Sequence, residues 1–212
     1  MSNIIDIHTK NKIHPTAVID DDVVMGVNNY VGPFCYLTGN LKIGSDNRFE
    51  GFCSVGTRPE HTDHWHKTGT VEIGHRNVFR ENISINSGTE DLTIIENNVI
   101  MLRGSHVAHD CIIEDKVTLS VKATILGHVH VMRHSNCGAC CVVHQHQVIG
   151  SWSMIGMGAV IPKSVRVEPG KVWVGVPAKE LKSNDYLMRQ VNIDTQRYET
   201  KRYLELVEEH DL

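Results

Sequence analysis

A large apolar residue returns at every sixth position over residues 95–178, without a change of register. An amphipathic helix would repeat its apolar residues every three or four positions and a single strand every two, so neither explains the pattern. A six-residue apolar period sustained over this length indicates a structural repeat. The apolar positions are Ile95, Met101, Val107, Ile113, Leu119, Ile125, Val131, Cys137, Val143, Ile149, Ile155, Ile161, Val167 and Trp173.

The fifth place of each hexad is mostly small, as at Ser105, Ala123 and Ala159. A large residue followed four places later by a small one describes a short strand and a turn wound around a narrow prism. This is the hexapeptide form of the parallel β-helix. The sequence therefore predicts an all-β solenoid built from hexapeptide repeats.

The same period extends the predicted solenoid towards the N-terminus and is interrupted twice. It holds over residues 13–55 and returns for three hexads beginning at Ile73. Residues 56–72 break the register with a polar stretch rich in His, which predicts an insertion loop on a rigid scaffold, a common place for functional residues. A second, shorter break falls around Glu90–Thr93. We expect one solenoid domain over residues 1–178.

The hexad pattern is lost after Trp173, and residues 179–212 differ in composition from the repeat. Tyr198, Tyr203 and Val207 have a spacing typical of one face of a helix. We predict a short helical C-terminal tail that caps the open end of the solenoid, where unpaired strand edges would otherwise be exposed.

The composition argues against several classes of partner. A formal net charge of −4 and a pI of about 6.4 leave no electrostatic footprint for nucleic acid, and no basic run suggests an anionic membrane surface. No stretch approaches the roughly 18 apolar residues of a membrane span, and the first residues lack the charged and apolar regions of a secretory signal. We expect a cytoplasmic protein with no integral membrane segment, whose partner is a small molecule or another protein.

The six cysteines fit the repeat better than they fit a disulfide or zinc framework. Cys137 takes an inward first place of a hexad, and only Cys140 has no clear place. The small fifth place is taken by the other four, Cys35, Cys53, Cys111 and Cys141. We expect free thiols that act as small core residues.

Several of the chain's fourteen histidines fall on one part of the predicted coil. If three hexads make one turn, residues one turn apart stack at a distance of about 4.8 Å. Asp110, His128 and His146 then form a single column. The hexads that begin at residues 107, 125 and 143 are expected on a common face, and they carry His109, His128, His130, His144 and His146, with His106 at the corner before them.

A face rich in imidazole suits either acid–base chemistry or metal binding. Histidine titrates near neutral pH and commonly acts as a general base, and a neighbouring carboxylate orients its ring. His109 beside Asp110 fits this role. Several facing histidines also bind zinc, so the residues alone leave a metal site open as the rival interpretation.

Three strings on this face carry a family resemblance. HVAHDC at 106–111, LGHVHV at 126–131 and VVHQ at 142–145 resemble the active-site motifs of UDP-N-acetylglucosamine O-acyltransferases, hexapeptide-repeat enzymes of lipid A biosynthesis. The likeness runs from about residue 13 to about residue 165. It implies a left-handed parallel β-helix, an exception to the right-handed crossover rule, assembled as a homotrimer with active sites between subunits.

The resemblance also implies roles for individual residues. His109 would be the general base that takes the proton of the acceptor hydroxyl as it attacks a thioester carbonyl, and the backbone N–H of Gly127 would stabilise the oxyanion. The acceptor would be a nucleotide sugar and the co-substrate an acyl carrier protein or CoA thioester, with no metal and no further cofactor expected. The residues expected to bind substrate are His106, Asp110, His128, His144, Gln145, Glu60, His61 and Asn86.

Several positions depart from the family pattern. His61 follows Glu60 where the family has an acidic residue after a glutamine, and Asp63 stands where it has a phosphate-binding lysine. Asn86 takes the place of a histidine, and the tail is shorter than the family's helical domain. Met157 falls where the family limits the length of the acyl chain, so we expect a shorter acyl group, because a packed site does not absorb extra methylenes without strain.

Two other functions stay open at the level of the sequence. The string GVPAK at 175–179 resembles the end of the coil in acetyl-CoA-dependent sugar N- or O-acetyltransferases. The second is a trimeric solenoid that has no catalytic activity and serves as a binding or scaffold protein. The γ-class carbonic anhydrases fit poorly, because they use a histidine pair five apart whereas His106 and His109 are three apart. The sequence does not specify the sugar, the donor, or the roles of His61, His64 and His66.

Overall fold

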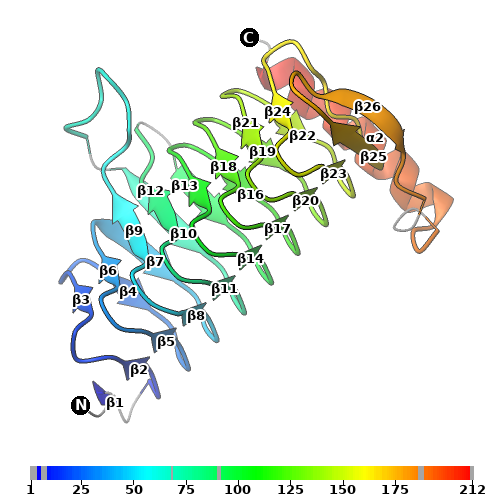
Figure 1. Ribbon diagram of the computed structural model, residues 1–212. Helices are drawn as coiled ribbons and strands as arrows, with labels where there is room; N and C mark the ends of the chain where they lie inside the picture. Colours follow the sequence, from blue (N-terminus) through cyan, green and yellow to red (C-terminus); the bar gives the residue numbers. More distant parts are fainter. Residues whose placement is uncertain (1–3, 6–8, 68, 90–91, 186–188, 211–212) are drawn as a thin grey trace.

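The computed structural model describes residues 4–5, 9–67, 69–89, 92–185 and 189–210 and is a left-handed parallel β-helix (Figure 1). Most of its strands are two residues long, and the coil passes in turn through three sheets. Helix α2 (Ile193–His210) follows the coil. The predicted solenoid with a helical tail is confirmed.

Within the described residues the three sheets hold eleven, eight and seven strands. The first sheet contains β1 (Ile4–Ile5), β2 (Lys12–Ile13), β5 (Tyr30–Val31), β8 (Arg48–Phe49), β11 (Val78–Phe79), β14 (Ile100–Met101), β17 (Thr118–Leu119), β20 (Asn136–Cys137), β23 (Met154–Ile155), β25 (Lys171–Val174) and β26 (Lys179–Ser183). The second contains β3 (Val18–Ile19), β6 (Tyr36–Leu37), β9 (Ser54–Thr57), β12 (Ser84–Asn86), β15 (His106–Val107), β18 (Thr124–Ile125), β21 (Val142–Val143) and β24 (Val160–Ile161). The third contains β4 (Val24–Met25), β7 (Asn40–Ile43), β10 (Thr70–Ile73), β13 (Leu92–Ile95), β16 (Ile112–Ile113), β19 (His130–Val131) and β22 (Val148–Ile149).

The apolar hexad positions line the inside of the coil. Val107 pairs with Ile125, and Ile125 pairs with Val143, so uninterrupted turns are in register every 18 residues. The predicted inward residues from Ile95 to Val167 are fully buried. Each aliphatic side chain removed from water contributes roughly 1.5–3 kcal/mol, which makes this column the main source of stability. Five cysteines are free and buried, as predicted, and Cys140 is exposed.

A residue in the left-handed conformation turns many of the corners. On the edge between the second and third sheets, Asp110, His128 and His146 have φ values of 56°, 58° and 60°. Most side chains avoid positive φ because the Cβ approaches the backbone, whereas Asp, Asn and His tolerate it better than others. This local preference favours polar, chemically active side chains at the corners of this edge.

The two interruptions of the hexad pattern are shorter than the sequence indicates. Strand β9 continues to Thr57 and β10 begins at Thr70, so the expected insertion loop narrows from 56–72 to residues 58–69. The strands extend because Thr57 pairs with Asn86 across a register shift and Thr70 pairs with both Asn40 and Leu92. At the second interruption Thr93 already belongs to β13, and Glu90 lies outside the described residues.

The C-terminal segment begins with a strand and ends with a helix. Strand β26 pairs with β25 in antiparallel fashion, so the first sheet continues beyond residue 178. Helix α2 packs on the flank of the last turns and not over the open end. On that flank, Tyr203 and Val207 of the helix join Met132 and Val148 of the coil in a separate apolar cluster. Its apolar spacing was predicted, but its docking site was not. No helix in the described parts of the chain combines the length and apolarity that crossing a bilayer requires.

Beneath α2, a buried carboxylate connects the helix to the coil. Glu114 lies on the corner after β16, and both of its oxygens accept hydrogen bonds from the guanidinium of Arg202. His130 Nε2 lies 2.5 Å from Glu114 Oε1. The expectation that His130 shares the histidine face is therefore wrong. The corner of residues 126–129 carries the chain onto the third sheet, where His130 faces α2.

Candidate active site

Two columns of side chains define the candidate site, on the edge between the second and third sheets. The 18-residue register of β15, β18 and β21 places His109, Gly127 and Gln145 in one column. The same register places Asp110, His128 and His146 in the adjacent column, as predicted. Successive residues of a left-handed corner thus carry the chemically active groups.

His109 and Asp110 form a buried hydrogen-bonded pair. His109 Nδ1 lies 2.8 Å from Asp110 Oδ2, and the two residues are 5% and 9% exposed. A carboxylate oxygen accepts, so Nδ1 carries the proton and Nε2 is the basic nitrogen. This tautomer is the one that a general base requires.

The carboxylate of Asp110 is held from a second direction by Thr89. The Thr89 N–H donates to Asp110 Oδ1 at 2.8 Å, and its hydroxyl donates to Oδ2 at 2.7 Å. Burial acts to raise the pKa of Asp110, but the hydrogen bonds from His109 and Thr89 outweigh it and hold that pKa well below its ordinary value. Asp110 is therefore ionised at neutral pH and fixes the His109 ring. Sequence reasoning missed Thr89, which lies 21 residues before Asp110 beside the register break.

Gly127 lies directly against the His109 ring. A Cβ at this position would stand 2.5 Å from His109 Cε1 and 2.7 Å from Nε2, so only glycine fits while the ring keeps its place. No backbone carbonyl of the described residues accepts the Gly127 N–H, whereas the amide of the next residue, His128, donates to the His109 carbonyl. An N–H group beside a basic imidazole is the arrangement that suits oxyanion binding.

His128 and His146 continue the cluster along the edge. The rings of His109 and His128 meet edge to face at 5.2 Å, and those of His128 and His146 stack at 4.5 Å. His128 Nε2 is 3.6 Å from Asp110 Oδ2. Burial, followed by the charge of His128, lowers the pKa of His146. His146 was recognised in the column from the sequence but was not among the predicted substrate-binding residues.

His106 projects outward from β15 and approaches the insertion loop. Its Nδ1 is 2.8 Å from Ser84 Oγ, and its Nε2 is 4.0 Å from Glu60 Oε2. Burial lowers the pKa of His106, while the charge of Glu60 acts in the opposite direction. A largely neutral His106 between a hydroxyl and a carboxylate is suited to hydrogen bonding with a polar ligand.

Solved structures show what the chain as a whole resembles, although no protein-family model matches it. The UDP-N-acetylglucosamine O-acyltransferase of Moraxella catarrhalis is 28% identical with a TM-score of 0.68, covering 90% of this chain and 82% of that one. The UDP-N-acetylglucosamine acyltransferase of Campylobacter jejuni is 26% identical with a TM-score of 0.73 and covers 90% and 82%. The Arabidopsis UDP-N-acetylglucosamine acyltransferase is 25% identical with a TM-score of 0.71 and covers 90% and 81%.

Over most of its length the chain is similar to UDP-N-acetylglucosamine acyltransferases. The resemblance predicted from the sequence is thus confirmed at the level of the whole chain.

The insertion loop reaches back to the His109–Asp110 pair. The ring of His61 meets that of His109 edge to face at 5.4 Å, and His64 lies 4.6 Å from His61. Glu60 and Asn86 border a groove of about 590 Å³ at the base of the loop. Asn86 is only 3% exposed, and its Nδ2 donates to Thr57 Oγ1 and to the Arg58 carbonyl at 3.1 and 3.0 Å. These contacts give Asn86 a role in anchoring the loop.

Three expected site residues lie farther from the His109–Asp110 pair. His144 is on the corner after β21, where its Nδ1 donates to the carbonyl of Gln145 at 3.0 Å, and the Gln145 side chain is exposed. Met157 is 83% exposed and follows β23, on the edge between the first and second sheets. Within one chain, Met157 and His109 therefore lie on different edges of the prism.

The cluster also contains a possible set of metal ligands. Among the described residues, His109, Asp110 and His128 offer ligand atoms that all lie within 4.8 Å of one another. A metal ion there would compete with the 2.8 Å hydrogen bond between His109 and Asp110. The pair as it stands has the geometry of an oriented base, which favours acid–base chemistry.

Proposed function

We propose that this protein transfers an acyl group from a thioester donor to a hydroxyl of a nucleotide-linked amino sugar such as UDP-N-acetylglucosamine. The observation that carries the proposal is the buried His109–Asp110 pair, with the basic nitrogen of His109 facing Gly127. Similar structures at 25–28% identity bear the name of this activity. We place the reaction in the cytoplasm, where carrier-protein and CoA thioesters are made.

The proposed reaction is a base-catalysed acyl transfer. His109 Nε2 takes the proton of the acceptor hydroxyl as the oxygen attacks the thioester carbonyl, and Asp110 stabilises the imidazolium that forms. The oxyanion accepts the Gly127 N–H, a contact worth about 3 kcal/mol when correctly aimed. Collapse of the intermediate breaks the C–S bond and releases the thiol, which takes the proton back from His109.

The remaining site residues are proposed to position the two substrates. His106 and His128 adjoin the pair and suit the sugar, together with Glu60 and His61 at the loop. His144 and Gln145 lie one turn beyond Gly127 and suit either the nucleotide or the donor. Asn86 is proposed to act on substrate through the loop it anchors.

The proposed role of Met157 in limiting the length of the acyl chain requires a second subunit. Met157 and His109 lie on different edges of one chain, so a donor chain that reaches both must run between neighbouring copies. We therefore propose a homotrimer with sites at the subunit boundaries.

The exposed, stacked rings of Phe34 and Phe52, 5.1 Å apart on the same edge as Met157, support an apolar contact surface there. Light scattering after size exclusion tests the assembly, and a monomer at micromolar concentration contradicts it.

A thiol-release assay tests the reaction itself. Acyl carrier protein and CoA donors of several chain lengths are paired with several nucleotide sugars, and His109→Ala is the inactive control. We expect release only with a nucleotide sugar present and its loss in His109→Ala, while circular dichroism stays unchanged. Turnover retained by that variant refutes the assignment. Preference for acetyl-CoA identifies a sugar acetyltransferase, and no consumption of any thioester identifies a non-catalytic binding or scaffold solenoid.

A further inference from the structure

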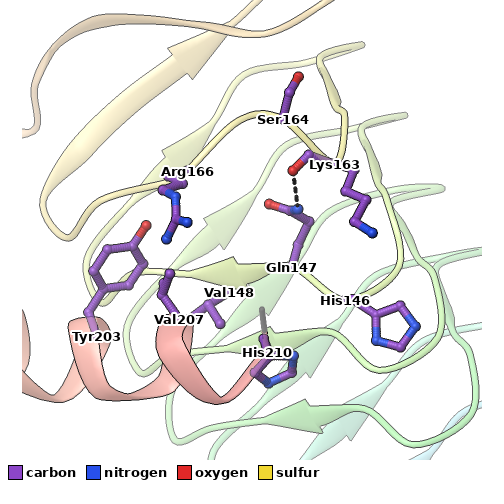
Figure 2. Close-up of a pocket in the computed structure, with 9 residues that line it drawn as sticks. All are labelled: His146, Gln147, Val148, Lys163, Ser164, Arg166, Tyr203, Val207 and His210. Atoms are coloured by element: carbon purple, nitrogen blue, oxygen red, sulfur yellow. Dashed lines mark hydrogen bonds between the residues drawn. The ribbon is translucent and has the colours of Figure 1, made fainter. Parts of the chain in front are cut away.

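A small basic pocket lies between the end of α2 and the last turns of the coil (Figure 2). Its volume is about 200 Å³, and Val148 and Val207 contribute apolar surface to its wall. The polar lining comes from three separate segments: the corner after β21, the turn after β24 and the last two turns of α2. These segments contribute His146, Gln147, Lys163, Arg166, Tyr203 and His210.

The lining is cationic. Lys163, Arg166, His146 and His210 border the pocket, and no carboxylate does so among the described residues; Glu209 borders the neighbouring cavity. In Figure 2 the guanidinium of Arg166 lies beside the hydroxyl end of Tyr203, and the Lys163 side chain points towards His146. Four groups that carry or can acquire positive charge around one hollow form a site for an anion.

The turn that carries the two strong cations is fixed in place. Gln147 is 7% exposed, and its Nε2 donates to the Lys163 carbonyl at 3.1 Å. The Val165 N–H closes the turn on the Pro162 carbonyl at 3.1 Å. A backbone held at both points presents Lys163 and Arg166 with little loss of freedom on binding, which is the benefit of preorganisation.

The local field agrees with this charge distribution. Burial is the largest cause of the lowered pKa of His146, and the charges of His128, His210 and Lys163 lower it further. His210 is in the last turn of α2, where a cation also offsets the partial negative charge of the helix end. An anion in the pocket would relieve this repulsion.

The size and position of the pocket indicate which anion it accepts. Pockets for whole organic ligands measure roughly 300–1,000 Å³, so a volume of about 200 Å³ suits one charged group of a larger molecule. His146 and His210 also line the neighbouring cavity of about 440 Å³, whose wall includes Asp110 and His128. A molecule with its charged group in the pocket would therefore extend towards the His109–Asp110 pair.

We propose that this pocket binds a phosphate group of a substrate, with Lys163 and Arg166 as its principal contacts and the rings of His146 and His210 as further hydrogen-bond partners. The diphosphate of a nucleotide sugar and the phosphate ester of a carrier arm share this chemistry. The identity of the substrate rests on the proposed function, whereas phosphate binding does not.

Calorimetric titration of inorganic phosphate into the full chain tests the pocket. The variant Lys163→Ala/Arg166→Ala is expected to bind at least about tenfold more weakly, because charge-assisted hydrogen bonds to the anion are lost. The matched control is Arg197→Ala/Lys201→Ala, which removes the same charge from an exposed part of α2 and should bind as the wild type does. Absence of phosphate binding to the wild type, or equal weakening in both variants, overturns the proposal.

Competition distinguishes the two sources of phosphate. Uridine diphosphate and 4′-phosphopantetheine are each titrated against bound phosphate, and the true substrate group should displace it in the wild type. In turnover, Lys163→Ala/Arg166→Ala should raise KM for that substrate about tenfold and leave kcat within about twofold. Displacement by neither compound overturns the assignment to a substrate. Phosphate binding without any acyl transfer contradicts the proposed function and leaves the anion site in place.

Discussion

The ring of His109 lies against the α-carbon of Gly127, one full turn further along the coil, so closely that a methyl group on Gly127 would stand 2.7 Å from Nε2. The basic nitrogen and the proposed oxyanion donor are thus placed by the register of the solenoid rather than by a loop. A site built on rigid elements holds its geometry more closely than one built on loops.

Gly127→Ala is expected to lower kcat by about 100-fold or more, because the added methyl group displaces the imidazole from its position beside the amide. Gly104→Ala is the control. Its added methyl group would meet only Lys122 Cγ, at 3.4 Å. Because Gly104 has a φ of +70°, this variant introduces backbone strain but leaves the candidate site untouched. Steady-state kinetics and thermal melting measure both variants. Full activity in Gly127→Ala would show that the reacting atoms lie elsewhere.

Asp110→Asn is expected to reduce kcat by roughly 10³-fold or more, because an amide no longer requires a proton on Nδ1 and permits the inactive tautomer of His109. Combining it with His109→Ala should add little, since residues that act as a unit are not additive. Asp115→Asn, which removes a carboxylate bonded to Asn97 on another edge, serves as the matched control. Near-additive losses in the double variant would contradict a shared role.

Thr89→Val tests the second support of the carboxylate. It preserves the shape and the backbone N–H but removes the hydroxyl that donates to Asp110 Oδ2 at 2.7 Å. We expect a fall in kcat of about tenfold with little change in KM, because one hydrogen bond to a charged group contributes about 1.5–3 kcal/mol. Thr118→Val on the first sheet should have no effect on turnover. An unchanged kcat in Thr89→Val would exclude a positioning role.

Glu114→Gln tests the attachment of α2 to the coil. Leaving Arg202 beside a neutral buried partner should cost about 3 kcal/mol of unfolding free energy, measured by denaturant titration. Glu180→Gln, at an exposed ion pair with Lys171, should change stability by less than about 1 kcal/mol.

The same carboxylate predicts a pH dependence. Burial acts to raise the pKa of Glu114, but hydrogen bonds from His130 and Arg202 outweigh it and lower that pKa to about 2. The pKa of Glu114 is therefore lower in the folded state than in the unfolded chain, where it is about 4.3. The ionised carboxylate contributes its full stabilisation of the fold above that unfolded value, and this stabilisation is lost as the pH falls from there towards 2. Wild type should lose more stability than Glu114→Gln between pH 5 and pH 2.5. Parallel curves would assign the acid sensitivity to other groups.

Met157→Gly tests the acyl-length proposal. Removing a side chain that is 83% exposed should alter donor preference without unfolding the coil. The ratio of kcat/KM for a donor two methylenes longer should rise about tenfold, since each buried methylene contributes about 0.8 kcal/mol. Competition between two donors measures this ratio directly. An unchanged preference would leave Met157 outside the acyl path.

The sequence predicted those features of the fold and of the site that depend only on the six-residue period. Val107, Ile125 and Val143 are stacked and buried as expected, and the column of Asp110, His128 and His146 follows from the same spacing. These inferences hold because a coil with a fixed turn length converts sequence separation into position.

The sequence did not predict contacts that cross a break in the period. Thr89 reaches Asp110 across a turn in which Ser84 pairs with His106, 22 residues further on in place of 18, and no periodic rule gives that offset. His130 was placed on the wrong face because hexad counting ignores the residues that turn a corner. The docking site of α2 depends on Met132 and Val148, whose outward apolar surface has meaning only once the third sheet is assembled.

Strand β26 has a consequence for how copies of the molecule meet. It ends the first sheet with five exposed residues, among them Lys179, Glu180 and Lys182. An uncovered terminal strand would offer its amides and carbonyls as a template to the next solenoid, and stacked coils could grow into fibres. The charged antiparallel strand hinders that polymerisation at the C-terminal edge of the first sheet.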